Sequence, residues 1–367
     1  MIADQTNNKS RQAELFTKEI LPQVSRTFDL AIKFLPEKLG RPVGLAYLLC
    51  RIADTFEDSA VMDPLSRQEM LHKYSDLLKV PGSYDLSLMS ELQDSFDIKG
   101  VSPDSQAETS SFPDHLPSVR LVENMDLVLT AADSMPIDFR NHIYPRVQEM
   151  SEGMARYTTL ASGKQSEIHF LKDEADWDNY CYFVAGTVGH MLTDIFSDYV
   201  GFSDTTRERL HPLGRSFGLG LQKVNVLKDA VIDTSRGVCF LPRTFIDQYG
   251  ITFGHKSLTG LKGDLRGLVL KVVEICRCHF QDSIEYIKLI PIKYLGLRMF
   301  LIVPVMLAAA TLRLITDYPQ KLLDNGDLKL TRNDVWKLVR KSALCKYSNR
   351  MLDYSFGKIL PSNLPAK

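Results

Sequence analysis

The chain has 367 residues, of which 44% are hydrophobic and 24% charged, so it can bury one large core or two smaller ones. Its 44 basic and 45 acidic residues leave a formal net charge of −1, which gives no electrostatic footprint for nucleic acid, and we expect no such partner. Six cysteines scattered through a chain of this length predict reduced thiols in a cytoplasmic compartment.

The start of the chain and its most apolar stretch both bear on membrane association. The first residues are polar and contain no apolar segment, so the sequence predicts no signal peptide. Residues 299–314 form the most apolar stretch, which Pro304 and Arg313 interrupt. Because this stretch is shorter than the roughly 20 residues that a spanning helix needs, we expect a core helix. The sequence therefore predicts a protein that is soluble or peripheral to a membrane.

In chain order, apolar residues recur every three or four positions, which is typical of amphipathic helices. Alternating patterns typical of strands are scarce, and so are hairpin turn signals. We therefore expect an all-α fold. The predicted helices span residues 13–35, 41–58, 66–79, 119–133, 138–160, 176–200, 205–233, 259–289 and 297–316.

One polar stretch interrupts this pattern. Residues 93–117 are rich in Ser, Asp and Pro and predict a loop or a weakly ordered connection. Such a stretch can divide two domains, but the candidate functional residues fall on both sides of it. We therefore expect a single domain, residues 1–367, with a mobile loop near 93–117 and a flexible C-terminal tail.

The first polar constellation lies on an otherwise apolar helix. Tyr47, Arg51, Asp54 and Asp58 are spaced four, three and four apart, so a helix places them along one face. Asp54 and Asp58 can converge on a hard cation, with Glu57 beside them. Magnesium typically takes one or two carboxylates together with substrate phosphates. The pattern indicates a magnesium site facing a diphosphate; the alternative is a solvated acidic face with an Arg51–Asp54 pair.

The second polar constellation lies on another apolar helix. Gln222, Asn225, Asp229 and Asp233 are spaced three, four and four apart and share one face. Asn and Asp are unfavourable inside helices because their side chains compete for backbone hydrogen bonds, so their presence on this stripe needs a reason.

The two acidic helices taken together indicate a metal-binding cavity more strongly than either helix does alone. If they form facing walls of one cavity, they can hold several metal ions around a diphosphate and stabilise its charge as it leaves. This is the electrostatic work that ionisation of an allylic diphosphate requires. The alternative is that the two helices are unrelated surfaces.

These clusters and their surroundings resemble the squalene and phytoene synthase family. The resemblance covers roughly residues 20–315 in the expected order, so no single short motif carries it. The matching segments are SRTFDLAIKFLP (25–36), AYLLCRIADTFED (46–58), SEGMARY (151–157), DNYCYFVAGTVG (178–189), LQKVNVLKDAVID followed by RG and LP (221–242) and, more weakly, MFLIVPVMLAAATL (299–312). The Asp-Thr-Phe-Glu-Asp run, and Lys223 after Gln222, resemble the squalene branch more than the phytoene branch.

The resemblance implies a fold and polar roles. The fold is that of the class I isoprenoid (terpenoid) synthases, a single all-α domain around a central cavity. Arg26, Arg51 and Lys228 would contact diphosphate oxygens, Arg through its fork geometry and Lys as a point charge. The implied magnesium ligands are Asp54, Glu57, Asp58, Asp229 and Asp233, with Gln222 and Asn225 supporting the second site.

The resemblance also implies aromatic roles. Tyr47 and Tyr180 would flank the reacting carbons, and Tyr180 corresponds to the tyrosine implicated in the first half-reaction. Phe28 and Phe300 would line the hydrocarbon tunnel. Aromatic faces stabilise an allylic cation by cation–π attraction without supplying a nucleophile that quenches it.

The sequence departs from the family pattern at the second cluster. Ile232 stands where a Glu is usual, Lys228 where an Arg is usual, and Ala230 where a larger residue is frequent. Two aspartates remain, which is enough for magnesium, but the negative charge of the site is lower.

The implied activity is that of a squalene synthase-like farnesyl-diphosphate farnesyltransferase. Two farnesyl diphosphates are joined head to head to give presqualene diphosphate, which is then converted to squalene. The reaction uses magnesium and NADPH. One alternative is non-reductive condensation to dehydrosqualene or phytoene, or water capture to a hydroxysqualene. Another is a catalytically silent relative that acts as a partner subunit. We also expect membrane contact for product release and a monomer or weak oligomer.

Two further motifs have structural interpretations. Cys276-Arg-Cys-His279 lacks a second half with zinc-site spacing, and it sits in a helical pattern. Gly218-Leu-Gly220 follows no strand and is not a dinucleotide fingerprint, because Lys223 occupies the third glycine position. We expect these glycines to permit close helix packing.

Overall fold

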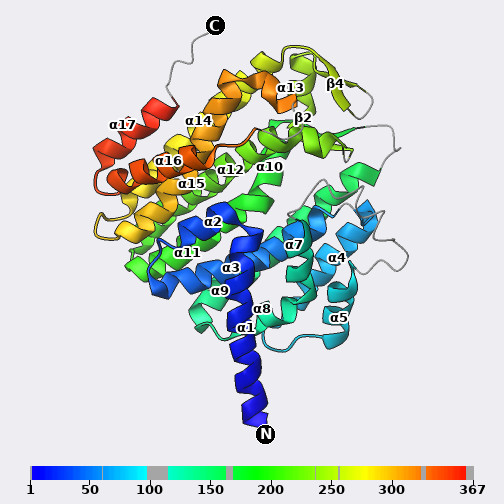
Figure 1. Ribbon diagram of the computed structural model, residues 1–367, viewed down its shortest axis with the longest axis vertical. Coiled ribbons are helices and arrows are strands. Elements are labelled where there is room, and N and C mark those ends of the chain that lie inside the picture. The colour runs from blue at the N-terminus through cyan, green and yellow to red at the C-terminus, as the bar shows by residue number, and fades with distance from the viewer. Residues whose placement is uncertain are drawn as a thin grey trace. The chain divides into compact units, whose positions relative to one another are not determined.

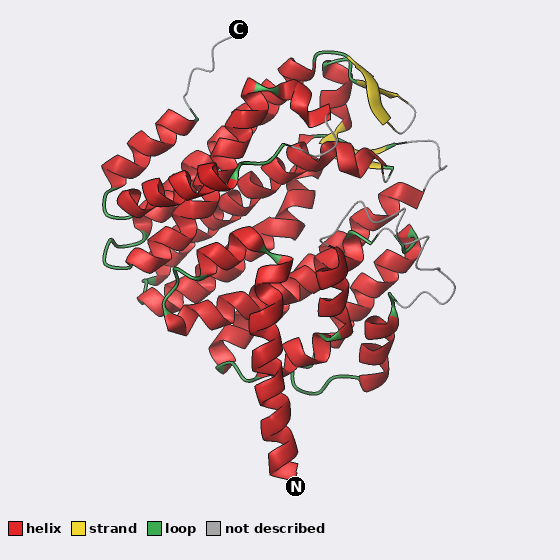
Figure 2. Ribbon diagram, viewed as in Figure 1, coloured by secondary structure: helices red, strands yellow, loops and turns green. Residues whose placement is uncertain are grey.

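A computed structural model describes residues 2–59, 61–96, 115–162, 168–235, 237–254, 257–323 and 328–360. Helices dominate these residues, with four short strands among them, as Figure 2 shows. The chain divides into two compact units. Unit 1 comprises residues 1–33 and 37–159, and unit 2 comprises residues 34–36 and 160–367.

Unit 1 is built of helices, labelled in Figure 1. Helix α3 (Glu37–Glu57) is largely buried, with fourteen buried residues. The other helices are α1 (Ile2–Val24), α2 (Arg26–Ile32), α4 (Pro64–Leu77), α5 (Leu86–Asp94), α7 (His115–Glu123), α8 (Met125–Asp133) and α9 (Ile137–Thr158).

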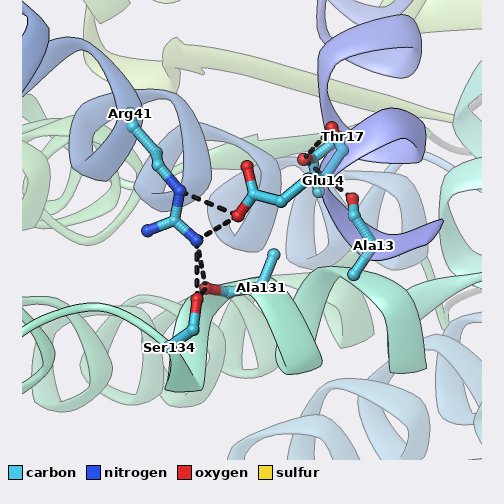
Figure 3. A network of polar contacts seen from close by, with 6 residues as sticks. All are labelled: Ala13, Glu14, Thr17, Arg41, Ala131 and Ser134. Carbon is cyan, nitrogen blue, oxygen red and sulfur yellow. Dashed lines mark hydrogen bonds and ion pairs between the residues drawn. The ribbon is translucent and has the colours of Figure 1, made fainter. Parts of the chain in front are cut away.

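Arg41 ties three helices of unit 1 together near the start of α3 (Figure 3). Its Nε donates to Glu14 Oε1 on α1 at 2.9 Å, and its Nη2 donates to the Ala131 carbonyl at the end of α8 at 3.0 Å. The same nitrogen donates to Ser134 Oγ at 2.6 Å. These bonds give the amino-terminal half of α3 fixed neighbours, and the candidate functional residues lie in its carboxyl-terminal half.

Unit 2 is also mainly helical. The long helix α12 (Asp204–Ser235) is packed against α11 (Thr187–Val200) and α14 (Leu265–Leu289). Two short sheets accompany it: β1 (His169–Leu171) pairs in parallel with β2 (Val238–Pro242), and β3 (Thr252–Gly254) pairs antiparallel with β4 (Ser257–Lys262). The remaining elements are α10 (Glu174–Cys181), the π-helical turn Tyr182–Gly186, α13 (Arg243–Gln248), α15 (Leu295–Asp317), α16 (Arg332–Cys345) and α17 (Asn349–Ile359), with short 3-10 turns at Thr159–Ser162 and Pro319–Leu323.

Glycines allow the backbones of α11, the π-helical turn and α12 to approach closely. A β-carbon on Gly189 would lie 2.0 Å from the Gly214 carbonyl oxygen, and one on Gly218 would lie 2.2 Å from the Ala185 carbonyl oxygen. Such distances are far inside van der Waals contact, so no larger residue fits without moving a backbone. The packing role predicted for Gly218 is confirmed.

The structure corrects three predicted helices. The helix predicted for 119–133 is divided by a turn at Asn124 into α7 and α8. Residues 13–35 do not form one helix, because Ser25 adopts an extended conformation and caps α2 by accepting a hydrogen bond from the Phe28 amide at 3.1 Å. The helix predicted for 259–289 begins at Leu265, since Ser257–Lys262 is strand β4. The predicted loop 93–117 lies mostly outside the described residues. The helices α5, α13, α16 and α17 were not predicted.

The apolar stretch near the C-terminus is helix α15, within unit 2. By length and composition it is the one helix among the described residues that could cross a membrane. Of its most apolar window, 67% is buried inside the protein. Its packing is that of a core helix, as the sequence predicts.

Candidate functional site

The end of α3 carries the first acidic cluster, Asp54, Glu57 and Asp58. The Asp58 amide donates to the Asp54 carbonyl at 2.9 Å, so helical geometry continues through Asp58 and sets the two carboxylates on one face. The side chain of Asp54 is 27% exposed and Asp58 is exposed. Glu57 is only 9% exposed and is turned towards the core. The predicted pair Asp54 and Asp58 is therefore placed together, with Glu57 deeper in unit 1.

The electrostatics of Asp54 suit a bound cation. The pKa of the Asp54 carboxyl is raised to about 7, chiefly by burial; Arg51, 3.8 Å away, lowers it in part, and the Asp58 carboxylate adds to the rise. Two carboxylates that lie close together repel each other, and a divalent cation bound between them removes this repulsion. Across the described ranges, no three His, Cys, Asp or Glu side chains converge on one metal position. The donor set fits magnesium held by two carboxylates and completed by substrate oxygens.

Tyr47 and Phe28 form an aromatic pair beside this cluster. Their ring centroids lie 5.5 Å apart, and the Tyr47 hydroxyl donates to the Val24 carbonyl at 3.2 Å. Burial raises the pKa of Tyr47, so its phenol is neutral at physiological pH. Arg26 is the first residue of α2, and its side chain lies outside the described residues.

Arg51 lies between the acidic cluster and helix α7. Its Nη2 donates to Ser118 Oγ at 3.2 Å, and Nη1 is 3.8 Å from Asp54 Oδ2. Its side chain is 26% exposed, so it is partly open to solvent. Sequence reasoning missed Ser118, which is 67 residues from Arg51 and carries no local signal.

The second acidic cluster, Asp229 and Asp233, lies near the end of α12 in unit 2. The helix is continuous to Ser235, so the spacing of four places both carboxylates on one face. Lys228 Nζ lies 3.2 Å from Asp229 Oδ2, with side chains 32% and 38% exposed. Further up the helix, Asn225 Nδ2 donates to Gln222 Oε1 at 3.5 Å. The predicted residues of this stripe therefore share a partly exposed helix face.

Tyr180 is the penultimate residue of helix α10 in unit 2 and is 4% exposed. Its ring stacks on Phe240 of β2, with centroids 4.3 Å apart and planes inclined by 6°. The chain then enters the π-helical turn, a local widening that is frequent at functional sites. Sequence reasoning missed Phe240, because it predicted no strand at that point.

Phe300 is 3% exposed on α15 and packs edge-to-face on Phe196, with ring centroids 5.7 Å apart. Lys223, identified in the sequence only as a family marker, is 1% exposed. A lysine on the apolar stripe of α12 is the signal that could have found it, since lysine is almost never fully buried unless paired.

Solved structures that resemble this chain share its all-α fold. TcSQS, solved with a bound ligand, superposes with a TM-score of 0.67 at 22% identity, covering 98% of this chain and 93% of that one. A dehydrosqualene synthase gives 0.58 at 18% identity, covering 92% and 97%. Squalene synthase HpnC from Alicyclobacillus acidocaldarius gives 0.54 at 18% identity, covering 84% and 94%. The fold is that of the terpenoid synthases.

Sequence relatives agree with the fold. The squalene synthase of Schizosaccharomyces pombe is 25% identical over 85% of this chain and 61% of its own length. A squalene synthase of Saccharomyces cerevisiae is 25% identical over 92% and 68%, and the Botryococcus squalene synthase of Botryococcus braunii 27% over 88% and 62%. The chain thus spans somewhat under two thirds of the length of several of these relatives. The Squalene/phytoene synthase family model matches residues 21–334. The chain belongs to the squalene/phytoene synthase family.

Proposed function

We propose that the chain catalyses magnesium-dependent head-to-head condensation of two farnesyl diphosphates to presqualene diphosphate, followed by conversion to squalene with NADPH. The observation that carries this proposal is the Asp54–Asp58 pair on one helix face, in which a partly buried carboxylate and an exposed one suit a cation that also binds a diphosphate. A second pair of the same spacing, Asp229 and Asp233, supports it. Family membership supports it too, and the curated relatives named above are squalene synthases.

Each group has a physical task in this reaction. Bound magnesium supplies Lewis-acid stabilisation of the departing diphosphate. Arg51 and Lys228, both partly exposed, bind diphosphate oxygens as charge-assisted donors. Phe28 and Tyr47 present aromatic faces that stabilise positive charge on an allylic carbon.

Tyr180 has a corresponding place in unit 2, where its ring is nearly covered and stacked on Phe240. The phenol can orient the leaving diphosphate or relay a proton, while the ring contributes cation–π attraction. Buried walls such as that around Phe300 keep water from intercepting the cations.

The described residues contain no glycine-rich phosphate loop that would mark an NADPH site. Gly218 and Gly220 lie inside α12, where β-carbons would meet Ala185 and His279. If the reductant is not used, two farnesyl diphosphates give dehydrosqualene, or an alcohol formed with water; phytoene would require two longer, twenty-carbon prenyl diphosphates.

Incubation of the purified protein with magnesium and radiolabelled farnesyl diphosphate tests the proposal. We expect diphosphate release that EDTA abolishes, and squalene as the product when NADPH is present. Gas chromatography with and without NADPH separates the reductive from the non-reductive reaction. The absence of diphosphate release at every magnesium concentration would refute the enzymatic function.

Ile232 is the observation that favours a second candidate, a catalytically silent relative acting as a partner subunit. An Ile at this position lowers the charge of the second cluster by one relative to the Glu that the family pattern has. If the enzyme is active but its second acidic cluster binds magnesium weakly, Ile232→Glu should lower the half-saturating magnesium concentration and leave the product unchanged. If Ile232 faces the hydrocarbon, the product changes and the magnesium response does not.

We extend the proposal to the substrate, the location and the oligomeric state of the protein. We propose that farnesyl diphosphate is the substrate, that the protein acts in the cytoplasm as a monomer or weak oligomer, and that product release involves a membrane surface. Co-sedimentation with vesicles, in the presence and absence of substrate, tests the membrane contact.

A further inference from the structure

A buried ammonium group lies at the centre of a polar network in unit 2. Lys223 is 1% exposed, and it and Arg298 are the two buried cations among the described residues. Removing an ion from water costs several kcal/mol unless it is paired and its donors are satisfied. We therefore expect the buried Lys223 of α12 to have hydrogen-bond acceptors or an opposite charge close to its ammonium group.

Three groups surround the Lys223 ammonium. It donates to Asp178 Oδ1 on α10, its Nζ lies 2.9 Å from His279 Nε2 on α14, and it stands 4.7 Å above the centre of the Trp177 ring. Lysine has three donors and no acceptor, so His279 Nε2 must be the acceptor. Two of the three partners, Trp177 and Asp178, belong to the last turns of α10.

The hydrogen bonds of this network run in one direction. Because His279 accepts at Nε2, its proton is on Nδ1, which lies 2.8 Å from Ser216 Oγ. Ser216 Oγ in turn donates to Asp282 Oδ2 at 2.6 Å. Burial and the adjacent Lys223 ammonium lower the pKa of His279 to about 4, so the imidazole is neutral near pH 7. The donor and the acceptor of each hydrogen bond in this network are therefore defined.

The same turn of α10 carries Tyr180, two residues after Asp178. Phe240 covers one face of the Tyr180 ring at 4.3 Å. Two and three residues before Tyr180 on the same helix, Lys223 contacts Asp178 and Trp177. Beyond Cys181 the chain enters the π-helical turn, so regular α-helical bonding does not continue past this point. The position of the phenol therefore depends on the Phe240 contact and on how the residues just before Tyr180 are held.

We propose that Lys223 is a positioning residue for Tyr180. By holding Trp177 and Asp178, it keeps the phenol in one place relative to the second acidic cluster, which lies on the same helix as Lys223. This proposal rests on the function proposed above for Tyr180, and its test includes a readout that does not need turnover.

The experiment compares Lys223→Met with Arg298→Met. Arg298 is a matched control, since it is 0% exposed in the same unit and donates to the Ile287, Ile290 and Lys346 carbonyls, away from α10. Both variants carry 3-fluorotyrosine, and the fluorine signal of residue 180 is assigned with Tyr180→Phe. Steady-state kinetics of diphosphate release are measured well below the melting temperature of each variant.

We expect Lys223→Met to move or broaden the fluorine signal of Tyr180 and to lower kcat about 10-fold or more, with KM within about twofold. Arg298→Met should lose stability but keep both the signal and kcat. Asp178→Asn, with its partner still in place, should give a smaller shift in the same direction.

An unchanged Tyr180 signal in Lys223→Met, or equal changes in Arg298→Met, would overturn the positioning role. If Lys223→Met does not fold, Asp178→Asn decides the question, and a Tyr180 signal and kcat like those of the wild type would then overturn the proposal. A wild-type protein that releases no diphosphate would refute the proposed function instead. The fluorine signal would then still report whether Lys223 fixes the phenol.

Discussion

At the residue scale, burial controls the charge state of Asp54. Its carboxyl has a pKa of about 7, against an ordinary value of 3.8, chiefly because it is partly withdrawn from water beside Asp58. An acid whose folded pKa is raised costs stability when it ionises. The metal-free protein therefore loses stability from this group as pH rises from about 4 to about 7.

Asp54→Asn should remove that loss and also abolish diphosphate release. In EDTA at pH 8 we expect the variant to be more stable than the wild type by about 1–2 kcal/mol. The full shift would correspond to about 4 kcal/mol, but the side chain is 27% exposed and partly solvated. Urea unfolding at pH 8 and pH 4 measures the difference, which should shrink at pH 4. A variant no more stable at pH 8, or one that keeps its turnover, contradicts this assignment.

His279 makes the opposite contribution. Its pKa is lowered to about 4, first by burial and then by Lys223, with Asp178 and Asp282 opposing and Arg215 adding a small lowering. A base whose folded pKa is depressed stabilises the fold above its ordinary value of 6.5. That stability is lost as pH falls from 6.5 to about 4.

His279→Gln should flatten the pH dependence of stability in this window. The Gln amide can still accept from Lys223, so the variant should fold. Urea midpoints at pH 7 and pH 4.5 provide the measurement, and His72→Gln on the surface of unit 1 is the control. A slope as steep as that of the wild type would mean that another group causes the acid sensitivity.

At the element scale, glycines set the distance between helices. Gly218 has no space for a side chain, because a β-carbon would lie 2.2 Å from the Ala185 carbonyl oxygen just before the π-helical turn ends. Gly357, in α17, has no atom within 4 Å of such a carbon. The two positions make a matched pair of helical glycines.

Gly218→Ala should destabilise the protein by about 1–3 kcal/mol or more, since the obstructing atoms are backbone and cannot turn away. Gly357→Ala should be neutral or stabilising by up to about 1 kcal/mol, because alanine is the better helix former and meets no obstacle. Urea unfolding compares the two. Equal effects at both positions would show that close packing at Gly218 does not limit stability.

At the scale of the whole molecule, the candidate functional residues are divided between the two units. Unit 1 holds Asp54 and Asp58 and unit 2 holds Asp229 and Asp233, each pair on one helix face. If both pairs act on the same chemical step, removing one should leave little for the other to contribute.

A double-mutant cycle tests this dependence. Asp58→Ala and Asp229→Asn should each lower the rate of diphosphate release by at least about 100-fold. The rate of the double variant should be only slightly below that of the less active single variant. Rates at saturating magnesium and farnesyl diphosphate provide the readout. Fully multiplicative losses would indicate two independent steps, and an active Asp229→Asn would remove the second cluster from the metal assignment.

The amino-acid sequence alone determined the helical class, the family and the grouping of candidate residues. Periods of three and four residues decide both helix and face, so Asp54 with Asp58, and Asp229 with Asp233, were predictable from local spacing. Local spacing did not reveal the break at Ser25, where one side chain caps a new helix, or strand β4, where the apolar pattern was compatible with both structures.

The tertiary structure decided the environment of those residues. Burial of Asp54, the Phe240 ring on Tyr180 and the partners of Lys223 all come from segments distant in the chain. Solvation and electrostatic energies depend on what surrounds a group in space, which a periodicity does not encode. For that reason the sequence could name the lysine at 223, while only the folded chain shows why it is there.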